Sequence, residues 1–336
     1  MSTEGTPLLT DDGRIAGLDG VRALAVLLVM TVHLYLVGCG WIGVQLFFVL
    51  SGFLITRILL ASKDKGGAGR YFGQFYLRRS LRIFPAYYAY LAAVFAAAAL
   101  HHAANEGRLL AMAPYLLSYT YNYGLLLAEP LRSNWTSHLW SLSVEEQFYI
   151  VWPLLIWLTP RRAILPLAGA IIVAGPLLRL AVFLWARGLE HPQIPPENIV
   201  YVFTSSHIDA FATGAALCFP GVARRLADLP NRWFLAAIAA AIAAGALWSG
   251  YFILPPTPRD APLALGFPVI MYTKGQWIWG YTAINLLGAV LIAKVALRGF
   301  GKRLFQSAPM DRLGRVSYGA YLFHYVMVSW FYPLTP

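Results

Sequence analysis

The chain has 336 residues, of which 59% are hydrophobic and only 12% are charged. Soluble domains carry about 25% charged residues, and too little polar sequence is present here to cover a large soluble core. The composition therefore excludes an ordinary soluble protein and predicts a multi-pass protein of the lipid bilayer. The net charge of +11 comes from basic residues between apolar runs, where the positive-inside bias places them, so we expect no nucleic-acid partner.

Residues 1–17 are predicted to form a cytoplasmic N-terminal tail, followed by a transmembrane domain over residues 18–336. Residues 1–16 lack the cationic start and the small-residue cleavage site of a removable signal peptide. The two cysteines, Cys39 and Cys218, cannot make a disulfide framework, and no metal-ligand spacing surrounds them. We therefore expect no metal site and expect both cysteines to pack as small apolar residues.

Apolar windows of about 20 residues, the length that spans a bilayer, predict an all-α bundle of about ten transmembrane helices. The tenth window, residues 109–128, is weaker because it contains Pro114, Ser118, Thr120 and Asn122. The other windows are 18–37, 42–61, 84–100, 138–159, 163–187, 205–220, 231–253, 276–297 and 316–335.

The distribution of basic residues predicts the orientation of the bundle. The first cluster follows the second window, so this loop and the N-terminus are expected on the cytoplasmic side of the inner membrane. If the chain crosses the membrane nine times, the later basic groups also lie on the cytoplasmic side. If it crosses ten times, they lie on the opposite side. The charge bias thus favours a re-entrant or broken segment at 109–128, which is tolerated where backbone lines a cavity, and a full tenth crossing remains the alternative. The first cluster is Lys63, Lys65, Arg70, Arg78, Arg79 and Arg82, and the later groups begin at Arg161, Arg224 and Arg298.

The stretch GVRALAVLLVMTVHL, residues 20–34, places Arg22 and His33 in a segment otherwise suited to lipid. An ionisable group at membrane depth costs at least ~2.5 kcal/mol on insertion scales, so neither side chain should face acyl chains. Their spacing is close to three helical turns, which puts them on nearly the same face, roughly 16 Å apart along the axis. We therefore expect a polar cavity, with Arg22 near its cytoplasmic mouth and His33 deeper inside.

Four further apolar segments carry polar residues of the same kind. In WSLSVEEQFYIVWPLL, residues 140–155, Ser141, Glu145 and Tyr149 recur every fourth position and share one helix face. Each set alone is explained about as well by packing, but together the polar faces are expected to surround one cavity. The other sets are Ser51-Gly52 in 43–57, His207 and Asp209 in 206–214, and Ser317, Tyr321 and His324 in 317–325.

Such a cavity suits two classes of protein. Intramembrane Asp, Glu and His residues form proton or substrate pathways in transporters, and a transporter or flippase is one interpretation. An imidazole base with a nearby carboxylate instead suits acyl transfer to a hydroxyl. Arginines at the cytoplasmic mouth suit the phosphates of acyl-CoA, because guanidinium binds phosphate oxygens in pairs. The residues alone leave the two classes open.

The chain resembles the acyltransferase 3 family of multi-pass membrane acyltransferases along nearly its whole length. LDGVRALAVLLVMTVHL is similar to the family's Arg-x10-His motif, and GVQLFFVLSGFLIT to its FFxxSG element. RRSLRIFPAYY resembles an Arg-x-x-Arg motif, here Arg79 and Arg82, and WSLSVEEQFYIVWPLL resembles Ser-x3-Glu-x3-Tyr. The segments around Asp209 and His324 resemble the family's late helices.

Two positions depart from the family's pattern. Gln45 stands where many members have Asp before the double Phe, and His207 stands where many have Arg. The resemblance implies transfer of an acetyl or short acyl group from acyl-CoA, most simply acetyl-CoA. This donor is a substrate and not a permanently bound cofactor. The implied acceptor is a hydroxyl of a cell-envelope glycan, a glycolipid or a macrolide-type metabolite.

The residues and the resemblance together predict roles at the site. His33 takes the proton from the acceptor hydroxyl or relays the acyl group covalently, and Glu145 orients the reacting pair or supports the histidine. Arginine side chains hold the donor, and further polar residues support the site or bind the acceptor. The donor-binding residues are Arg22, Arg79 and Arg82, and the supporting or acceptor-binding residues are Asp19, Ser51, Ser141, Tyr149, Asp209 and His324.

Overall fold

The computed structural model describes residues 14–100, 106–126, 135–189, 194–249, 263–269, 271 and 275–331, and its regular elements are helices. Residues 1–13 of the expected tail and the ends of three expected windows, 127–128, 250–253 and 332–335, lie outside the described residues. The first half contains α1 (Leu18–His33), η1 (Gly38–Trp41), α2 (Ile42–Ser62), α3 (Ala68–Leu100), α4 (Glu106–Leu117), α5 (Tyr121–Gly124), η2 (Ser137–Leu139) and α6 (Trp140–Leu158). The second half contains α7 (Arg161–Arg187), α8 (Pro196–Val202), η3 (Thr204–His207), α9 (Ile208–Ala216), α10 (Pro220–Ala227), α11 (Asn231–Ser249), α12 (Gln276–Arg298), α13 (Lys302–Phe305), α14 (Ala308–Arg315) and α15 (Ser317–Phe331).

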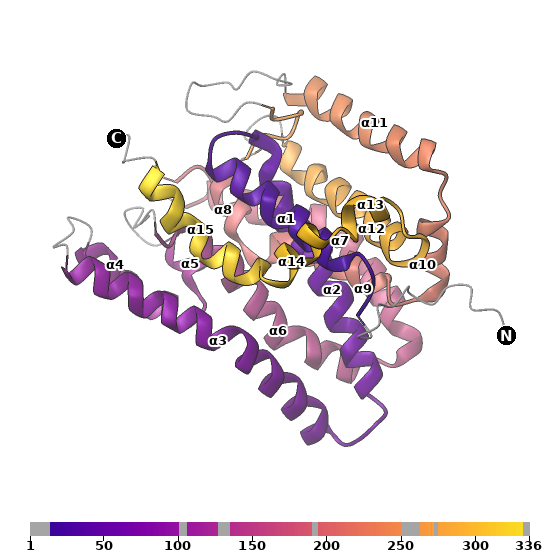
Figure 1. Cartoon of the computed structure of the whole chain (residues 1–336), viewed down its shortest axis with the longest axis horizontal. Coiled ribbons are helices and arrows are strands. Elements are labelled where there is room, and N and C mark those ends of the chain that lie inside the picture. Colours follow the sequence, from indigo (N-terminus) through magenta and orange to yellow (C-terminus); the bar gives the residue numbers. More distant parts are fainter. Residues whose placement is uncertain are drawn as a thin grey trace.

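The expectation of an all-α membrane protein is confirmed. By length and composition, five helices of the described chain are suited to crossing a bilayer, namely η1 with α2, α3, α7, α11 and α12. The apolar windows of α2 and α12 are 61% and 67% buried, whereas that of α11 is only 17% buried. Figure 1 shows this difference, with α2 in the middle of the bundle and α3 and α11 along opposite edges.

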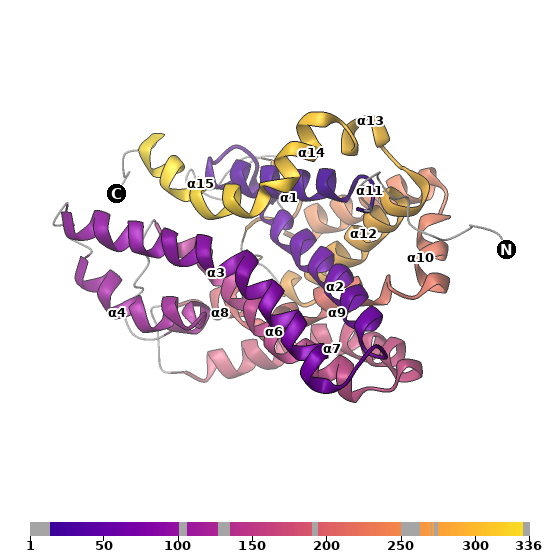
Figure 2. The same cartoon turned by 60° about the horizontal axis from the view of Figure 1, so that its bottom comes forward.

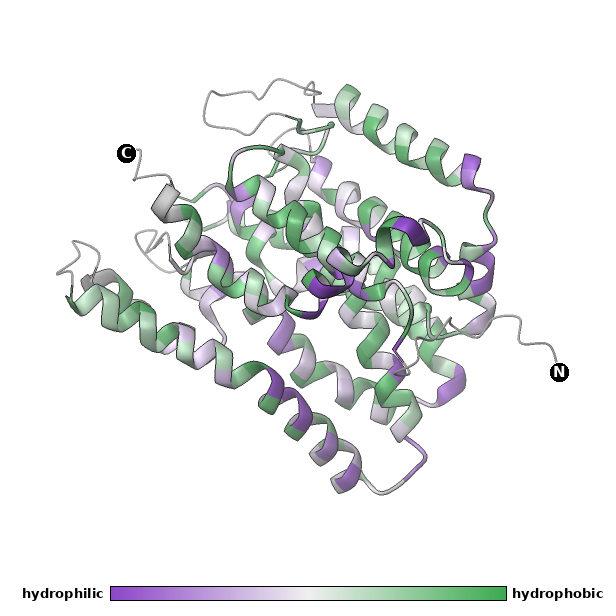
Figure 3. Cartoon of the chain, viewed as in Figure 1, coloured by the Kyte–Doolittle hydropathy of each residue, from purple (hydrophilic) through white to green (hydrophobic). Residues whose placement is uncertain are grey.

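Helix α3 is longer than the span expected from the sequence. Residues 63–83 were expected to be a basic loop before a span at 84–100, but α3 begins at Ala68 and has 33 residues. At 1.5 Å per residue it is about 50 Å long, well beyond the ~30 Å hydrocarbon core. Figure 3 shows that hydrophilic residues recur in its first half and that its second half is mainly hydrophobic. The basic residues at 70–82 are thus held on a rigid helix.

Two expected windows do not form single spanning helices. In the described part of 109–128, α4 ends at Leu117, Tyr119 adopts a positive φ of 54°, and α5 has only four residues. A 12-residue helix such as α4 reaches about 18 Å, too short to cross. The window 205–220 is likewise divided, because α9 has nine residues and lies buried between α2 and α7.

The basic groups gather at one end of the bundle. Arg161 forms an ion pair with Asp64 at 2.5 Å, and Lys63 donates hydrogen bonds at 2.5 Å to carbonyls at the end of α6. Arg298 pairs with Asp228, just after α10, at 2.7 Å. A cavity lined by Lys65 together with residues of α7, α10 and α12 joins these segments. The later basic groups therefore lie at the same end of the bundle as the first cluster.

Glycine permits the closest helix packing at the centre. A Cβ on Gly52 of α2 would collide with the carbonyl of Phe211 on α9, and a Cβ on Gly214 would collide with the carbonyl of Val49. The two helices therefore lie in backbone contact, as small residues allow inside membranes. This contact fixes the register of the neighbouring Ser51. Both cysteines are free thiols, with Cys39 buried and Cys218 partly buried.

Candidate active site

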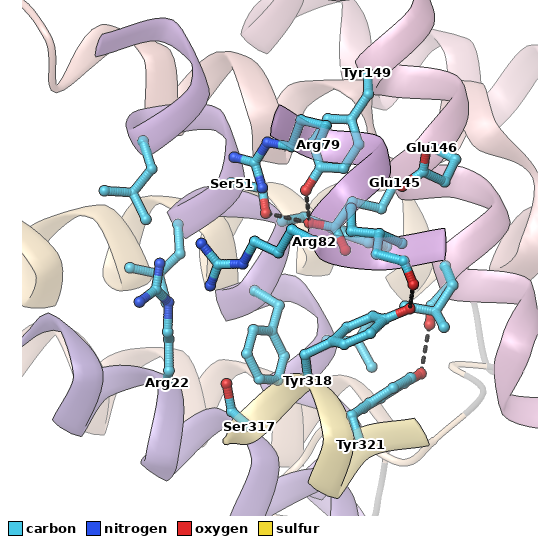
Figure 4. Close-up of a pocket in the computed structure, with 18 residues that line it drawn as sticks. Arg22, Ser51, Arg79, Arg82, Glu145, Glu146, Tyr149, Ser317, Tyr318 and Tyr321 are labelled. Carbon is cyan, nitrogen blue, oxygen red and sulfur yellow. Dashed lines mark hydrogen bonds between the residues drawn. The ribbon is translucent and has the colours of Figure 1, made fainter. Parts of the chain in front are cut away.

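Seven of the eleven site residues expected from the sequence line one cavity, which we call the carboxylate cavity. Its volume is about 100 Å³, and its walls come from α1, α2, α3, α6 and α15 (Figure 4). In Figure 2, α1 and α15 lie above α3 and α6, and α2 lies beside α6. The seven residues are Arg22, Ser51, Arg79, Arg82, Ser141, Glu145 and Tyr149.

Glu145 is held in this cavity by neutral groups. The hydroxyls of Ser51 and Tyr149 both donate to its Oε1, and Figure 4 shows them on either side of the carboxylate. Within the described chain no ion pair to Glu145 is present and its Oε2 has no hydrogen-bond partner. The guanidinium of Arg79 lies 4.8 Å from the centroid of the Tyr149 ring.

His33 lies in a second cavity of about 380 Å³, the histidine cavity. The Nδ1 atom of His33 is 2.7 Å from Nε2 of His324. The two cavities share Val44 and Tyr321 as lining residues, so these two side chains form the wall between them. The structure therefore pairs His33 with His324, and Glu145 is in the neighbouring cavity without direct contact to either histidine.

A third cavity, the basic groove, joins the other side of the carboxylate cavity. It has a volume of about 580 Å³ and lies along the ends of α2 and α3. Arg79 and Arg82 line both the groove and the carboxylate cavity. The groove also contains Lys65, Arg70 and Arg78. The three cavities thus follow one another from a cationic groove, past a carboxylate, to an imidazole.

Asp19 supports the mouth of the carboxylate cavity. Its carboxylate contacts Arg14 and Arg22, each at 2.5 Å. Asp19 is nearly buried, whereas Arg22 is partly exposed and lines the cavity. An ion pair of this kind restricts the guanidinium of Arg22 to one side of the cavity.

Asp209 lies outside all three cavities. It pairs with Arg179 at 3.0 Å and accepts a hydrogen bond from Thr282 at 2.6 Å. The side chains of Asp209 and Arg179 are both 0% exposed, and Arg179 also donates to the carbonyls of Ser206 and Ile278. The structure thus gives Asp209 a position that ties α7, α9 and α12 together, away from the other expected site residues.

The two departures from the family's pattern contact each other. The amide nitrogen of Gln45 is 2.9 Å from Nδ1 of His207, and Nε2 of His207 donates to the carbonyl of Tyr201 at 2.9 Å. Both side chains are buried. The two departures therefore meet in one hydrogen-bonded contact in this chain.

The sequence interpretation missed His138 and Arg179. His138 is 2% exposed and lines the histidine cavity beside His33. It precedes Ser141 by three residues, so helical spacing could have placed it on the same polar face. Arg179 lies in the apolar run PLLRLAVF of α7, where one intramembrane arginine was itself a signal.

Among the described residues no three His, Cys, Asp or Glu side chains are grouped to hold a metal ion.

The fold and the cavities define a polytopic membrane protein with a polar interior site. A family model described as an acyltransferase domain matches residues 15–336, and the chain belongs to the acyltransferase 3 family. It is 30% identical over 329 residues to the peptidoglycan O-acetyltransferase OatA of Listeria monocytogenes, covering 94% of this chain and 49% of that protein. It is 31% identical over 344 residues to a putative peptidoglycan O-acetyltransferase of Bacillus subtilis, with 94% and 48% covered.

A putative O-acetyltransferase of Staphylococcus aureus is 29% identical over 336 residues, which cover 94% of this chain and 51% of that protein. The chain therefore spans about half the length of the curated relatives it matches. No solved structure matches it.

Proposed function

We propose that the chain is a membrane-embedded O-acetyltransferase. It moves an acetyl group from acetyl-CoA at the cytoplasmic face of the inner membrane to a hydroxyl of a cell-envelope glycan. Residues 18–336 form the transferase domain, and the N-terminal tail is cytoplasmic. The observation that carries the proposal is the series of three cavities with shared walls, from the basic groove to His33.

The basic groove suits the nucleotide end of the donor. Guanidinium groups bind phosphate oxygens in pairs, and Arg70, Arg78, Arg79 and Arg82 line a single groove of about 580 Å³. The pantetheine arm then enters between Arg79 and Arg82, which border both cavities. The carboxylate cavity has a volume of only about 100 Å³, which favours acetyl over longer acyl groups.

The chemistry needs a base for the acceptor hydroxyl. As the hydroxyl oxygen forms a bond to the thioester carbonyl carbon, His33 takes the hydroxyl proton. The C–S bond then breaks, and the departing thiolate takes the proton back, which leaves an ester and free CoA. A positioned base of this kind contributes about 10²–10⁴-fold in rate. Movement of Val44 and Tyr321, the wall between the cavities, opens the route from the thioester to His33.

Glu145 acts on the donor side of that wall. Its Oε1 atom is held by Ser51 and Tyr149, which directs the free Oε2 toward the entering arm. A carboxylate there accepts hydrogen bonds from the pantetheine amides and orients the thioester.

The names of the relatives in Listeria and Bacillus support peptidoglycan as the acceptor, and other envelope glycans, glycolipids and secondary metabolites offer the same hydroxyl group.

The experiment measures thioester consumption by the full protein reconstituted in lipid nanodiscs. Acetyl-labelled acetyl-CoA and a glycan acceptor are supplied, and both free CoA and label on the glycan are followed. We expect coupled release and transfer, with a loss of at least about 10²-fold in His33→Ala. A transporter or flippase instead predicts movement of substrate across liposomes without thioester consumption, and that result would overturn the proposal.

A further inference from the structure

A chain of hydrogen bonds fixes the proton positions on the paired histidines. Nδ1 of His324 is 2.5 Å from the backbone carbonyl oxygen of Tyr321. A carbonyl only accepts hydrogen bonds, so Nδ1 of His324 carries the proton and, in the neutral ring, its Nε2 is an acceptor. Nε2 of His324 is 2.7 Å from Nδ1 of His33. Nδ1 of His33 must therefore be the donor, which leaves Nε2 of His33 with a free lone pair.

The ring of His33 is also held in place by packing. Its ring centroid lies 4.9 Å from that of His324, with the ring planes 27° apart, and 4.6 Å from that of Tyr325, with the planes 63° apart. His33 lines the histidine cavity and is partly exposed there, and its Nε2 has no hydrogen-bond partner in the described chain. The free lone pair is thus presented by a ring of fixed orientation.

His138, which lines the same cavity, has a second free lone pair. Its Nε2 is 3.1 Å from the carbonyl of Leu322, so Nε2 carries the proton and Nδ1 is an acceptor. That Nδ1 atom is buried and has no hydrogen-bond partner. The ring is stacked on Tyr325 at 5.0 Å and an interplanar angle of 6°, and its centroid is 5.1 Å from that of His324. A buried acceptor without a donor is costly, so this site favours a bound molecule that donates.

We propose that two successive carbonyls of α15, those of Tyr321 and Leu322, set the tautomers of a three-histidine acceptor site. His324 is a positioning residue that keeps Nε2 of His33 free to take a hydroxyl proton. His138 accepts a hydrogen bond from a second hydroxyl of the same acceptor. The acceptor class is therefore a sugar or other polyol with neighbouring hydroxyls. This inference rests on the proposed function for its chemistry, whereas the tautomers are independent of it.

The first test measures the tautomers directly. The full protein is labelled with ¹⁵N-histidine and studied in lipid by solid-state NMR, where protonated and bare ring nitrogens have different shifts. Assignments come from comparison with His33→Gln, His138→Gln and His324→Gln. We expect a bare Nε2 on His33 and a bare Nδ1 on His138. A proton on Nε2 of His33 would overturn the inference, whether or not the protein transfers acetyl groups.

The second test separates positioning from packing by using two substitutions of His324. Glutamine can place an amide oxygen where Nε2 of His324 accepts from His33, whereas leucine fills the space without an acceptor. We expect His324→Leu to lower kcat by about 10²-fold with little change in the KM for acetyl-CoA, and His324→Gln to recover most of the rate. Equal kcat values in the two variants would contradict the role of His324.

The third test concerns His138. His138→Gln keeps an N–H donor for the carbonyl of Leu322 but removes the unpartnered lone pair of Nδ1. We expect the KM for a polyol acceptor to rise about 10-fold, as loss of one hydrogen bond to a bound ligand predicts, while the KM for acetyl-CoA stays constant. A simple alcohol with one hydroxyl should show no such change. An unchanged KM for the polyol would remove His138 from the acceptor site.

Discussion

Two carboxylates of the membrane interior, Glu145 and Asp209, are held in opposite ways. Asp209 is fully buried, paired with Arg179 and remote from the three cavities. Glu145 borders a cavity and is held by the hydroxyls of Ser51 and Tyr149, with no ion pair in the described chain. An intramembrane carboxylate is by default a candidate functional group. The comparison shows that its partners decide between a structural and a chemical role.

Removal of the partner of Asp209 should produce the largest effect. Arg179→Leu leaves a buried carboxylate without its cation, and breaking such a pair costs about 3–5 kcal/mol. We expect a large loss of folded protein, measured as yield and unfolding temperature in detergent. The matched double variant Arg179→Leu with Asp209→Leu should recover part of that loss, because no unpaired charge remains.

The Arg179→Leu variant also tests whether Asp209 has a structural role that differs from the role of Glu145. If Arg179→Leu retains the unfolding temperature and loses only acetyl transfer, then Asp209 acts in the reaction. The buried pair would in that case belong with Glu145 in function.

The opposite pattern is expected for Glu145. Glu145→Gln keeps the size of the side chain and can still accept hydrogen bonds from Ser51 and Tyr149, so the free energy of unfolding should change by less than about 1 kcal/mol. Loss of the charge beside the entering thioester should lower kcat by about 10²-fold. Steady-state CoA release and thermal unfolding, measured on one preparation, test both halves. Lower stability with unchanged kcat would make Glu145 a structural residue like Asp209.

The arginines of the groove should show a smaller effect, confined to donor binding. Arg79→Lys keeps the charge but loses the paired geometry of the guanidinium, so the KM for acetyl-CoA should rise about 10-fold, equivalent to ~1.4 kcal/mol. Arg161→Lys is the matched control, because Arg161 pairs with Asp64 outside the groove. An equal rise in KM in both variants would indicate a general effect of charge on the protein.

Sequence patterns predicted which residues share a helix face, but they did not predict which side chains contact each other between helices. The spacing of Ser141, Glu145 and Tyr149 is a property of one helix, and the structure places all three at the same cavity. The pairing of Asp209 with Arg179 depends on how α7 and α9 pack together. The residue pattern of either helix alone does not predict this packing. The same applies to His33 and His324, which meet across 291 residues of sequence.

The division of the expected windows also depends on tertiary structure. Apolar residues in 205–220 predict a segment removed from water. A segment surrounded by protein and a segment surrounded by lipid have similar compositions, so the sequence does not distinguish them. The nine-residue helix α9 is surrounded by protein, so it needs neither the length nor the continuity of a spanning helix. Polar residues in 109–128 did indicate a broken segment, and the described part of that window consists of the short helices α4 and α5.

The smallest expected effect concerns one hydroxyl that holds Glu145. Tyr149→Phe removes the donor to Oε1 and leaves Ser51 in place. One such bond contributes about 1 kcal/mol, so kcat/KM should fall roughly 5-fold and the free energy of unfolding should fall by about 1 kcal/mol. Tyr87→Phe removes a buried hydroxyl that donates to the carbonyl of Leu116 at 2.8 Å, away from all three cavities. The control should lose a similar amount of stability and keep its kinetics, so unchanged kinetics in both variants would mean that Glu145 does not depend on its hydroxyl donors for function.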